Sequence, residues 1–159
     1  MPYLRITAPL LILLLAACGG KEAVDPVGTA ELTGLYLGDG EGKQQDRICM
    51  VKAPSGAVRF GIVTLELDRA ACSGIGRIEQ GRVEQSGAEL RLVMAGEEDC
   101  VVPASVSGTR VTLAASVPEG CSYYCGPGAM LAGKSFEKTQ DSLEGAMSAD
   151  DLVGNPLCR

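Results

Sequence analysis

Six cysteines constrain the fold of this chain more than any other feature of its sequence. They are Cys49, Cys72, Cys100, Cys121, Cys125 and Cys158. An even number of cysteines in a small exported domain indicates a disulfide framework. The "CSYYC" stretch has three residues between its cysteines, whereas redox motifs and many zinc sites have two, so neither a redox nor a metal site is expected. We therefore expect three disulfides.

The core explains why such bridges are needed. Tryptophan is absent, and the aromatic residues beyond position 30 are Tyr36, Phe60, Tyr123, Tyr124 and Phe136. A small domain with few large side chains buries limited apolar area, and each bridge adds about 2–4 kcal/mol. Six cysteines allow 15 connectivities, which the sequence alone does not separate. Our working expectation is that Cys49 pairs with Cys72, and that Cys100 and Cys158 pair with the Cys121/Cys125 couple. Cys158 then fastens the carboxy-terminal tail to the domain.

Apolar and polar residues alternate from Leu32 to about Val117, as in half-buried antiparallel strands. In "AELRLVM", Leu90, Leu92 and Met94 share one face. Ser-Gly pairs, which are typical of tight turns, recur at positions 55–56, 73–74, 86–87 and 107–108. The pattern predicts an all-β fold, a small antiparallel meander of seven to eight strands closed as a barrel or a sandwich.

Two details complete this expected fold. In "VRFGIVTLEL" the apolar residues change phase, which predicts a β-bulge near Gly61. Near the carboxy terminus we expect a short helical segment with Ser148 as its N-cap and a stop at positions 154–156.

The amino terminus has the layout of a secretory signal: Arg5, an apolar run from position 8 to 15, and small residues. The run is about half the ~20 residues that span a bilayer. "LAAC", residues 15–18, resembles the lipobox of bacterial lipoproteins. The resemblance implies cleavage after Ala17, a diacylglyceryl group and an N-acyl chain such as palmitate on Cys18, and, because Gly19 follows, an outer-membrane anchor facing the periplasm. An ordinary signal peptide is the alternative.

These features divide the chain into three parts. Residues 1–17 form the signal peptide, 18–31 the lipidated terminus and a flexible tether, and 32–159 a single β-rich domain with its tail. Without residues 1–17 the chain has 13 cationic and 20 anionic side chains, a formal charge of −7. That charge argues against nucleic acid and favours a basic protein as any charged partner.

Catalysis is not expected. The chain has no histidine, which excludes histidine-dependent nucleophiles and histidine metal sites, and no cofactor is expected. The acidic run at 97–99 is more typical of a solvated turn than of a carboxylate pair. A small envelope enzyme therefore remains only an alternative, and we expect a binding or envelope-maintenance protein.

Two places are candidate binding sites. In "PEGCSYYCGPGA", residues 118–129, a disulfide could hold Tyr123 and Tyr124 rigidly for contact with a partner; alternatively, one tyrosine belongs to the core and the other covers a barrel end. The other is "KAPSGAVRFG", which resembles the motif of the membrane-bound C-type lysozyme inhibitors, small β-barrel lipoproteins. The resemblance implies that Ser55 and Arg59 enter the cleft of a lysozyme-like hydrolase.

Overall fold

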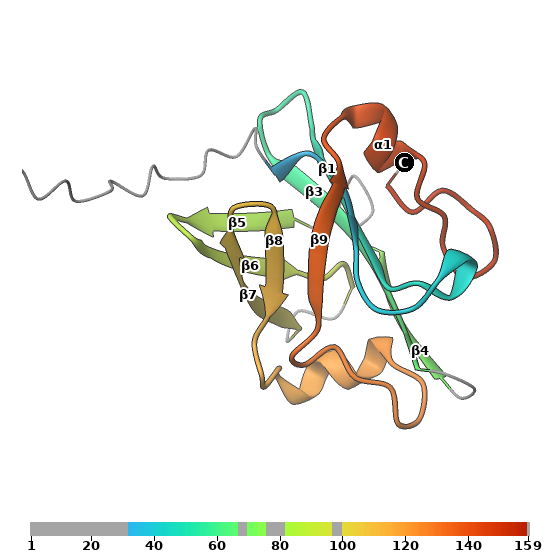
Figure 1. Ribbon diagram of the computed structural model, residues 1–159. Helices are drawn as coiled ribbons and strands as arrows, with labels where there is room; N and C mark the ends of the chain where they lie inside the picture. The colour runs from blue at the N-terminus through green and yellow to red at the C-terminus, as the bar shows by residue number, and fades with distance from the viewer. Residues whose placement is uncertain (1–31, 67–69, 76–81, 97–99, 159) are drawn as a thin grey trace, which may run out of the picture.

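The computed structural model describes residues 32–66, 70–75, 82–96 and 100–158 (Figure 1). Its elements in chain order are β1 (Gly34–Leu37), η2 (Gly42–Gln44), β2 (Arg47–Lys52), β3 (Val58–Glu66), β4 (Ala70–Ile75), β5 (Arg82–Ser86), β6 (Glu89–Val93), β7 (Val101–Ser107), β8 (Arg110–Leu113), η3 (Glu119–Tyr124), β9 (Ser135–Gln140) and α1 (Leu143–Met147). The η elements are 3-10 helices.

The strands form one antiparallel sheet that closes on itself. Its order is β2-β1-β9-β8-β7-β6-β5-β3-β4, and an additional pairing of β2 with β3 completes the ring. Eight strands therefore make a barrel, and β4 lies outside the ring. The expected all-β fold is confirmed, and of the two closures considered the barrel is the observed one.

β3 pairs with two different strands along the same edge. Val58 at its start pairs with Val83 of β5, which continues the ring. Residues 61–66 pair with residues 70–75 of β4. Figure 1 shows β4 extending away from the barrel at the end where the orange segment 118–131 lies. The fork brings β4 within reach of that segment.

The strands form where alternation predicts them. In β6, Leu90 and Leu92 are buried while Glu89 and Arg91 are exposed. The Ser-Gly pairs at 86–87 and 107–108 connect β5 to β6 and β7 to β8, and both glycines have positive φ, which suits a tight hairpin turn. The pair at 55–56 lies in the β2–β3 turn. The pair at 73–74 does not form a turn, because it lies inside β4 and pairs with residues 62–63 of β3.

The barrel interior is a packed core. Alternate residues of the barrel strands point inward and fill it, among them Tyr36, Met50, Phe60, Leu92 and Phe136. The hydroxyl of Tyr36 donates to the carbonyl of Leu32 at 2.9 Å. Burial, followed by the charge of Asp141, raises the pKa of this phenol. The buried hydroxyl of Tyr36 thus has a hydrogen-bond partner four residues away in the chain, as buried polar groups require.

A second apolar cluster lies on the outer face of β1, β2 and β3. Residues 142–158, here called the C-terminal strap, cover it from outside (Figure 1, red). The strap begins with α1, whose N-cap is Ser142; its hydroxyl accepts from the Gly145 amide at 2.9 Å. The expected helix with Ser148 as its N-cap is wrong in position, because Ser148 follows the last helical residue as the C-cap.

The strap packs tightly against the barrel at Gly61. A Cβ at this position would lie 2.6 Å from both Cγ and the carbonyl oxygen of Leu157, so only glycine fits there. The β-bulge expected at Gly61 is absent, since the register of β2 with β3 is continuous from residue 47 to 52. The apparent change of phase has another cause: Phe60 and Ile62 face the interior while Val63 faces the strap, so both faces of β3 are apolar.

All six cysteines beyond Cys18 form disulfides. The pairs are Cys49–Cys158, Cys72–Cys125 and Cys100–Cys121. The three bridges are nested, the first cysteine with the last, the second with the fifth and the third with the fourth. The expected Cys49–Cys72 bridge is wrong because β4 joins the far edge of β3 while Cys49 faces the strap. Cys158 fastens the tail as expected, but to β2.

Candidate functional site

Residues 118–131, here called the tyrosine loop, cover one end of the barrel between β8 and β9 (Figure 1, orange). Cys121 and Leu131 point into the inner cluster, and each is 1% exposed. Tyr123 and Met130 point outward and are 73% and 59% exposed. The loop therefore closes the core on one side and presents two large apolar side chains on the other.

Two disulfides fasten the helical part of this loop, one from within η3 and one directly after it. Cys121 is bonded to Cys100 just before β7, and Cys125 is bonded to Cys72 of β4. The amide of Gly126 donates to the carbonyl of Ala71 at 3.0 Å, which extends the contact with β4. Tyr123 thus lies on a short segment whose backbone has little freedom.

Tyr124 adds a third attachment to the barrel. Its hydroxyl donates to the carbonyl of Ala95 at 2.6 Å, and its half-buried ring packs against the inner cluster. The rings of Tyr123 and Tyr124 meet edge to face, with 5.3 Å between centroids and 86° between planes. This geometry is favourable for an aromatic pair. The two tyrosines therefore differ in role: Tyr124 positions the loop and Tyr123 is presented to solvent.

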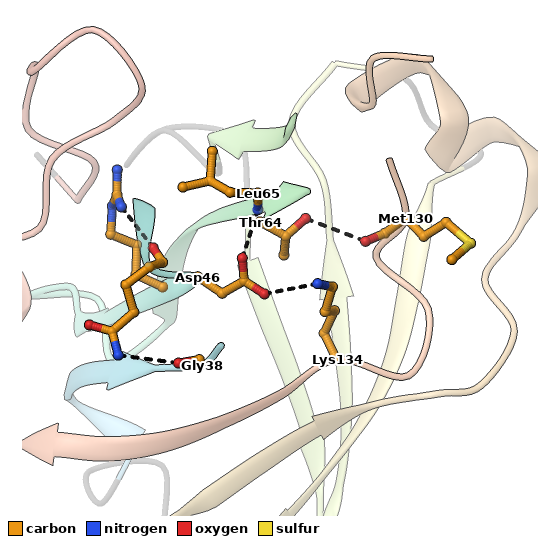
Figure 2. Close-up of polar contacts among 8 residues, drawn as sticks. Gly38, Asp46, Thr64, Leu65, Met130 and Lys134 are labelled. Atoms are coloured by element: carbon orange, nitrogen blue, oxygen red, sulfur yellow. Dashed lines mark hydrogen bonds and ion pairs between the residues drawn. The ribbon is translucent and has the colours of Figure 1, made fainter. Parts of the chain in front are cut away.

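The chain after the tyrosine loop is tied down by a buried ion pair (Figure 2). Lys134 Nζ lies 3.1 Å from Oδ2 of Asp46, whose side chain is 1% exposed. The other carboxylate oxygen accepts from the Leu65 amide at 2.7 Å. Nearby, the Thr64 hydroxyl donates to the carbonyl of Met130 at 3.4 Å. Since a buried carboxylate needs compensation, this pairing fixes the exit of the loop to β2 and β3.

Sequence reasoning missed the pair formed by Asp46 and Lys134. They are 88 positions apart, and each lies in a polar stretch that resembles any solvated turn. One signal was available: Asp46 immediately precedes β2 and lies two positions before its apolar run "ICMV", a place where a carboxylate can accept from a neighbouring strand.

The second pair of predicted binding residues lies elsewhere. Ser55 is exposed in the β2–β3 turn, and Arg59 is half-buried on β3, opposite Val51 in the register. Figure 1 shows this turn at the end of the barrel opposite the tyrosine loop. The structure therefore separates the two candidate sites instead of combining them.

Several expected features fall outside the described residues. These are the signal peptide at 1–17, Cys18 with the tether to residue 31, and the acidic run at 97–99. Within the described ranges, no cluster of three or more histidine, cysteine or acidic side chains could hold a metal ion. Nor does this part of the chain contain a helix of the length and apolarity that crossing a bilayer requires.

Comparison with known proteins gives no assignment: no family model, curated protein or solved structure matches the chain.

Proposed function

We propose that this chain is a lipid-anchored protein of the bacterial envelope, at the outer membrane and facing the periplasm, which binds a protein partner through the tyrosine loop without catalysis. The lipobox-like residues 15–18 support the anchor. The tyrosine loop supports the binding role, and its geometry carries the proposal.

The observation that favours binding is the exposure of Tyr123 on a segment fixed by two disulfides. Large apolar side chains exposed on a rigid element are favourable contacts, because little conformational entropy is lost when a partner covers them. Tyrosine is also among the residues that dominate the energy of protein interfaces. The 73% exposure of Tyr123 leaves most of its ring available.

Charge indicates the chemistry of the partner. The whole chain has 14 cationic and 20 anionic side chains, and Glu119, the first residue of the η3 helix that carries both tyrosines, is exposed. A partner that presents arginine or lysine would gain from the acidic surface and from the face of the Tyr123 ring. The partner is therefore a basic protein surface.

Photo-crosslinking in the producing cells tests the proposal. A photoreactive amino acid replaces the exposed Ser122 in the full-length chain, and its adducts are identified by mass spectrometry with Tyr123 intact or as Tyr123→Ala. We expect one predominant protein adduct that is reduced about tenfold by the substitution, a typical loss for an interface anchor.

The matched control places the same photoreactive group at Ser105, an exposed position on the outer face of β7. Its adducts are expected to differ from those at Ser122 and to be unaffected by Tyr123→Ala. Equal labelling at both positions, or labelling at Ser122 that persists without the tyrosine, would contradict the proposal.

The anchor has a test of its own. Cys18→Ser removes the thiol that would carry the diacylglyceryl group, so the protein should leave the membrane fraction and lose incorporation of labelled palmitate, since two or more acyl chains make anchoring stable. A Cys18→Ser protein that remains with the membranes at unchanged mass would refute the lipid anchor.

A second candidate function, inhibition of a lysozyme-like hydrolase, is favoured by Ser55, which is exposed in the turn of the β2–β3 hairpin. Ser55→Ala combined with Arg59→Ala should abolish inhibition of a C-type lysozyme, while Tyr123→Ala should not change it. Absence of inhibition by the unmodified protein at micromolar concentration rejects this candidate.

A further inference from the structure

A groove of about 530 Å³ lies between the C-terminal strap and η2. Leucines form its apolar lining: Leu35 and Leu37 from β1, and Leu65 from β3. One wall is η2 with Lys43, and the other is the strap from residue 148 to 154. The groove lies on the outside of the barrel, away from the tyrosine loop.

Arg47 fixes the two walls relative to each other. Its Nε donates to the carbonyl of Asp150 at 2.6 Å, and its Nη1 donates to the carbonyls of Gln45 at 2.8 Å and Lys43 at 3.2 Å. Burial lowers the pKa of this guanidinium, and the nearby carboxylate of Asp150 opposes that shift. Because one side chain binds both walls, the groove is a preformed hollow.

Two apolar side chains stand on the rim of this hollow. Val153 is 80% exposed and Leu152 is 47% exposed. Their turn is fixed by Asp151, whose Oδ1 accepts from the amides of Val153 at 2.9 Å and Asn155 at 2.8 Å. The exposed Leu152 and Val153 therefore form an apolar projection directly beside the leucine-lined groove.

Two opposite charges also lie across the groove from each other. Lys43 is exposed on the η2 wall, and Asp150 is exposed on the strap wall. A surface with a projection beside a hollow, and a cation across from an anion, is complementary to a copy of itself rotated by two-fold symmetry.

We infer that this groove is a homodimer interface, in which Val153 and Leu152 of each copy enter the groove of the other and Lys43 lies beside Asp150 of the second copy. The contact is isologous, so each pairing occurs twice. It uses a surface separate from the tyrosine loop and does not depend on the proposed function.

Charge reversal tests the arrangement and identifies the second copy as the occupant. Lys43→Glu alone places two like charges at both contacts, and so does Asp150→Lys alone. When the two variants are mixed, each contact joins opposite charges again. We therefore expect dimers for the unmodified full-length protein, a loss of about tenfold or more in dimer affinity for each variant alone, and recovery as a heterodimer in the mixture.

Native mass spectrometry of the purified full-length proteins resolves these species by mass, and thermal unfolding checks that each variant is folded. Val153→Glu should also abolish the dimer. The matched control is Leu143→Glu, an exposed leucine of α1 that does not line the groove and should leave the dimer intact.

Three results would overturn the inference. They are a protein that is monomeric at all concentrations tested, a Val153→Glu variant that dimerises as the unmodified protein does, and a mixture of the charge-reversed variants that stays monomeric. If one variant fails to fold, the inference is still tested by the other variants and by the unmodified protein, which must itself form the dimer.

Discussion

The two hydrophobic clusters lie on opposite faces of the same three strands, yet they are closed in different ways. The inner cluster draws residues from the strands around the whole ring and is sealed by hydrogen-bonded strand pairs. The outer cluster is covered by a single segment, the strap, whose one disulfide is Cys49–Cys158. A cluster built from the whole chain can open only when the barrel unfolds, whereas one covered by a terminal segment can open by itself.

Removing one disulfide from each cluster should change the free energy of unfolding more than any other substitution considered. It should also distinguish the two clusters most clearly. With Cys72–Cys125 intact, the loop opened by Cys49→Ala with Cys158→Ala is the 109-position separation less the 53 positions that the inner bridge bypasses, whereas Cys100→Ala with Cys121→Ala opens one of 21 residues. In the chain-entropy model the losses of unfolding free energy are about 4 and about 3 kcal/mol. Denaturant titration measures both. Equal losses would show that native-state contacts, rather than loop closure, set the contribution of each bridge.

Truncation of one core side chain in each cluster sharpens the comparison. Phe60→Ala should lower the free energy of global unfolding by about 3–5 kcal/mol, because it leaves a cavity that the ring of strands cannot fill. Leu157→Ala should mainly increase local opening of the strap, since its neighbours can move outward. Amide hydrogen exchange distinguishes these outcomes: faster exchange in all strands for the first, and in residues 142–158 alone for the second. Strand exchange accelerated to the same extent by Leu157→Ala would refute the difference.

Gly61→Ala probes the contact between β3 and the strap. The new methyl group would meet Leu157 at 2.6 Å, so the strap must shift, at a cost of about 1–3 kcal/mol typical of overpacking. The same substitution in a Cys49→Ala/Cys158→Ala background should cost less, because the strap is then free to move. A double-mutant cycle by thermal unfolding measures this coupling. An unchanged cost would place the strain within the strands rather than at the strap.

Acidification should have the smallest effect on stability, and it acts on an exposed carboxylate of β9. The Thr109 hydroxyl and Arg110 Nε, the latter at 3.0 Å, donate to the Glu137 carboxylate and lower its pKa. The folded state thus binds this proton less readily than the unfolded chain, so the stabilisation is present above the ordinary glutamate pKa and is lost as pH falls through the lowered value. Glu137→Gln should flatten the dependence of the unfolding temperature on pH in this acid range. Screening of an exposed group keeps the change small.

The fold was predictable where a residue's role depends on its neighbours in sequence. Alternation placed Leu90 and Leu92 inside, and the even cysteine count predicted three bridges. Pairing of Cys49 with Cys158 was not predictable, because it depends on the fork at β3 and on which face the strap covers. The same applies to Gly61, whose small size is required by a residue 96 positions later.

The candidate site shows a similar division. Two tyrosines between cysteines predicted a constrained loop, and the structure shows Tyr123 exposed and Tyr124 anchored. Which tyrosine faces solvent depends on the carbonyl of Ala95 and on where β4 lies, and neither is encoded near residue 123. The groove between the strap and η2 had no signal in the sequence, since its leucines resemble ordinary strand residues.

Nesting of the disulfides has a consequence for biogenesis. If the chain is exported amino end first, Cys49 and Cys72 reach the oxidising compartment together, long before either native partner. Prompt oxidation would join them wrongly, whereas the native set closes from the inside outward and ends with the 109-residue loop. In that case maturation would require thiol–disulfide exchange that undoes early errors, and cells lacking an isomerase would accumulate scrambled forms of this protein.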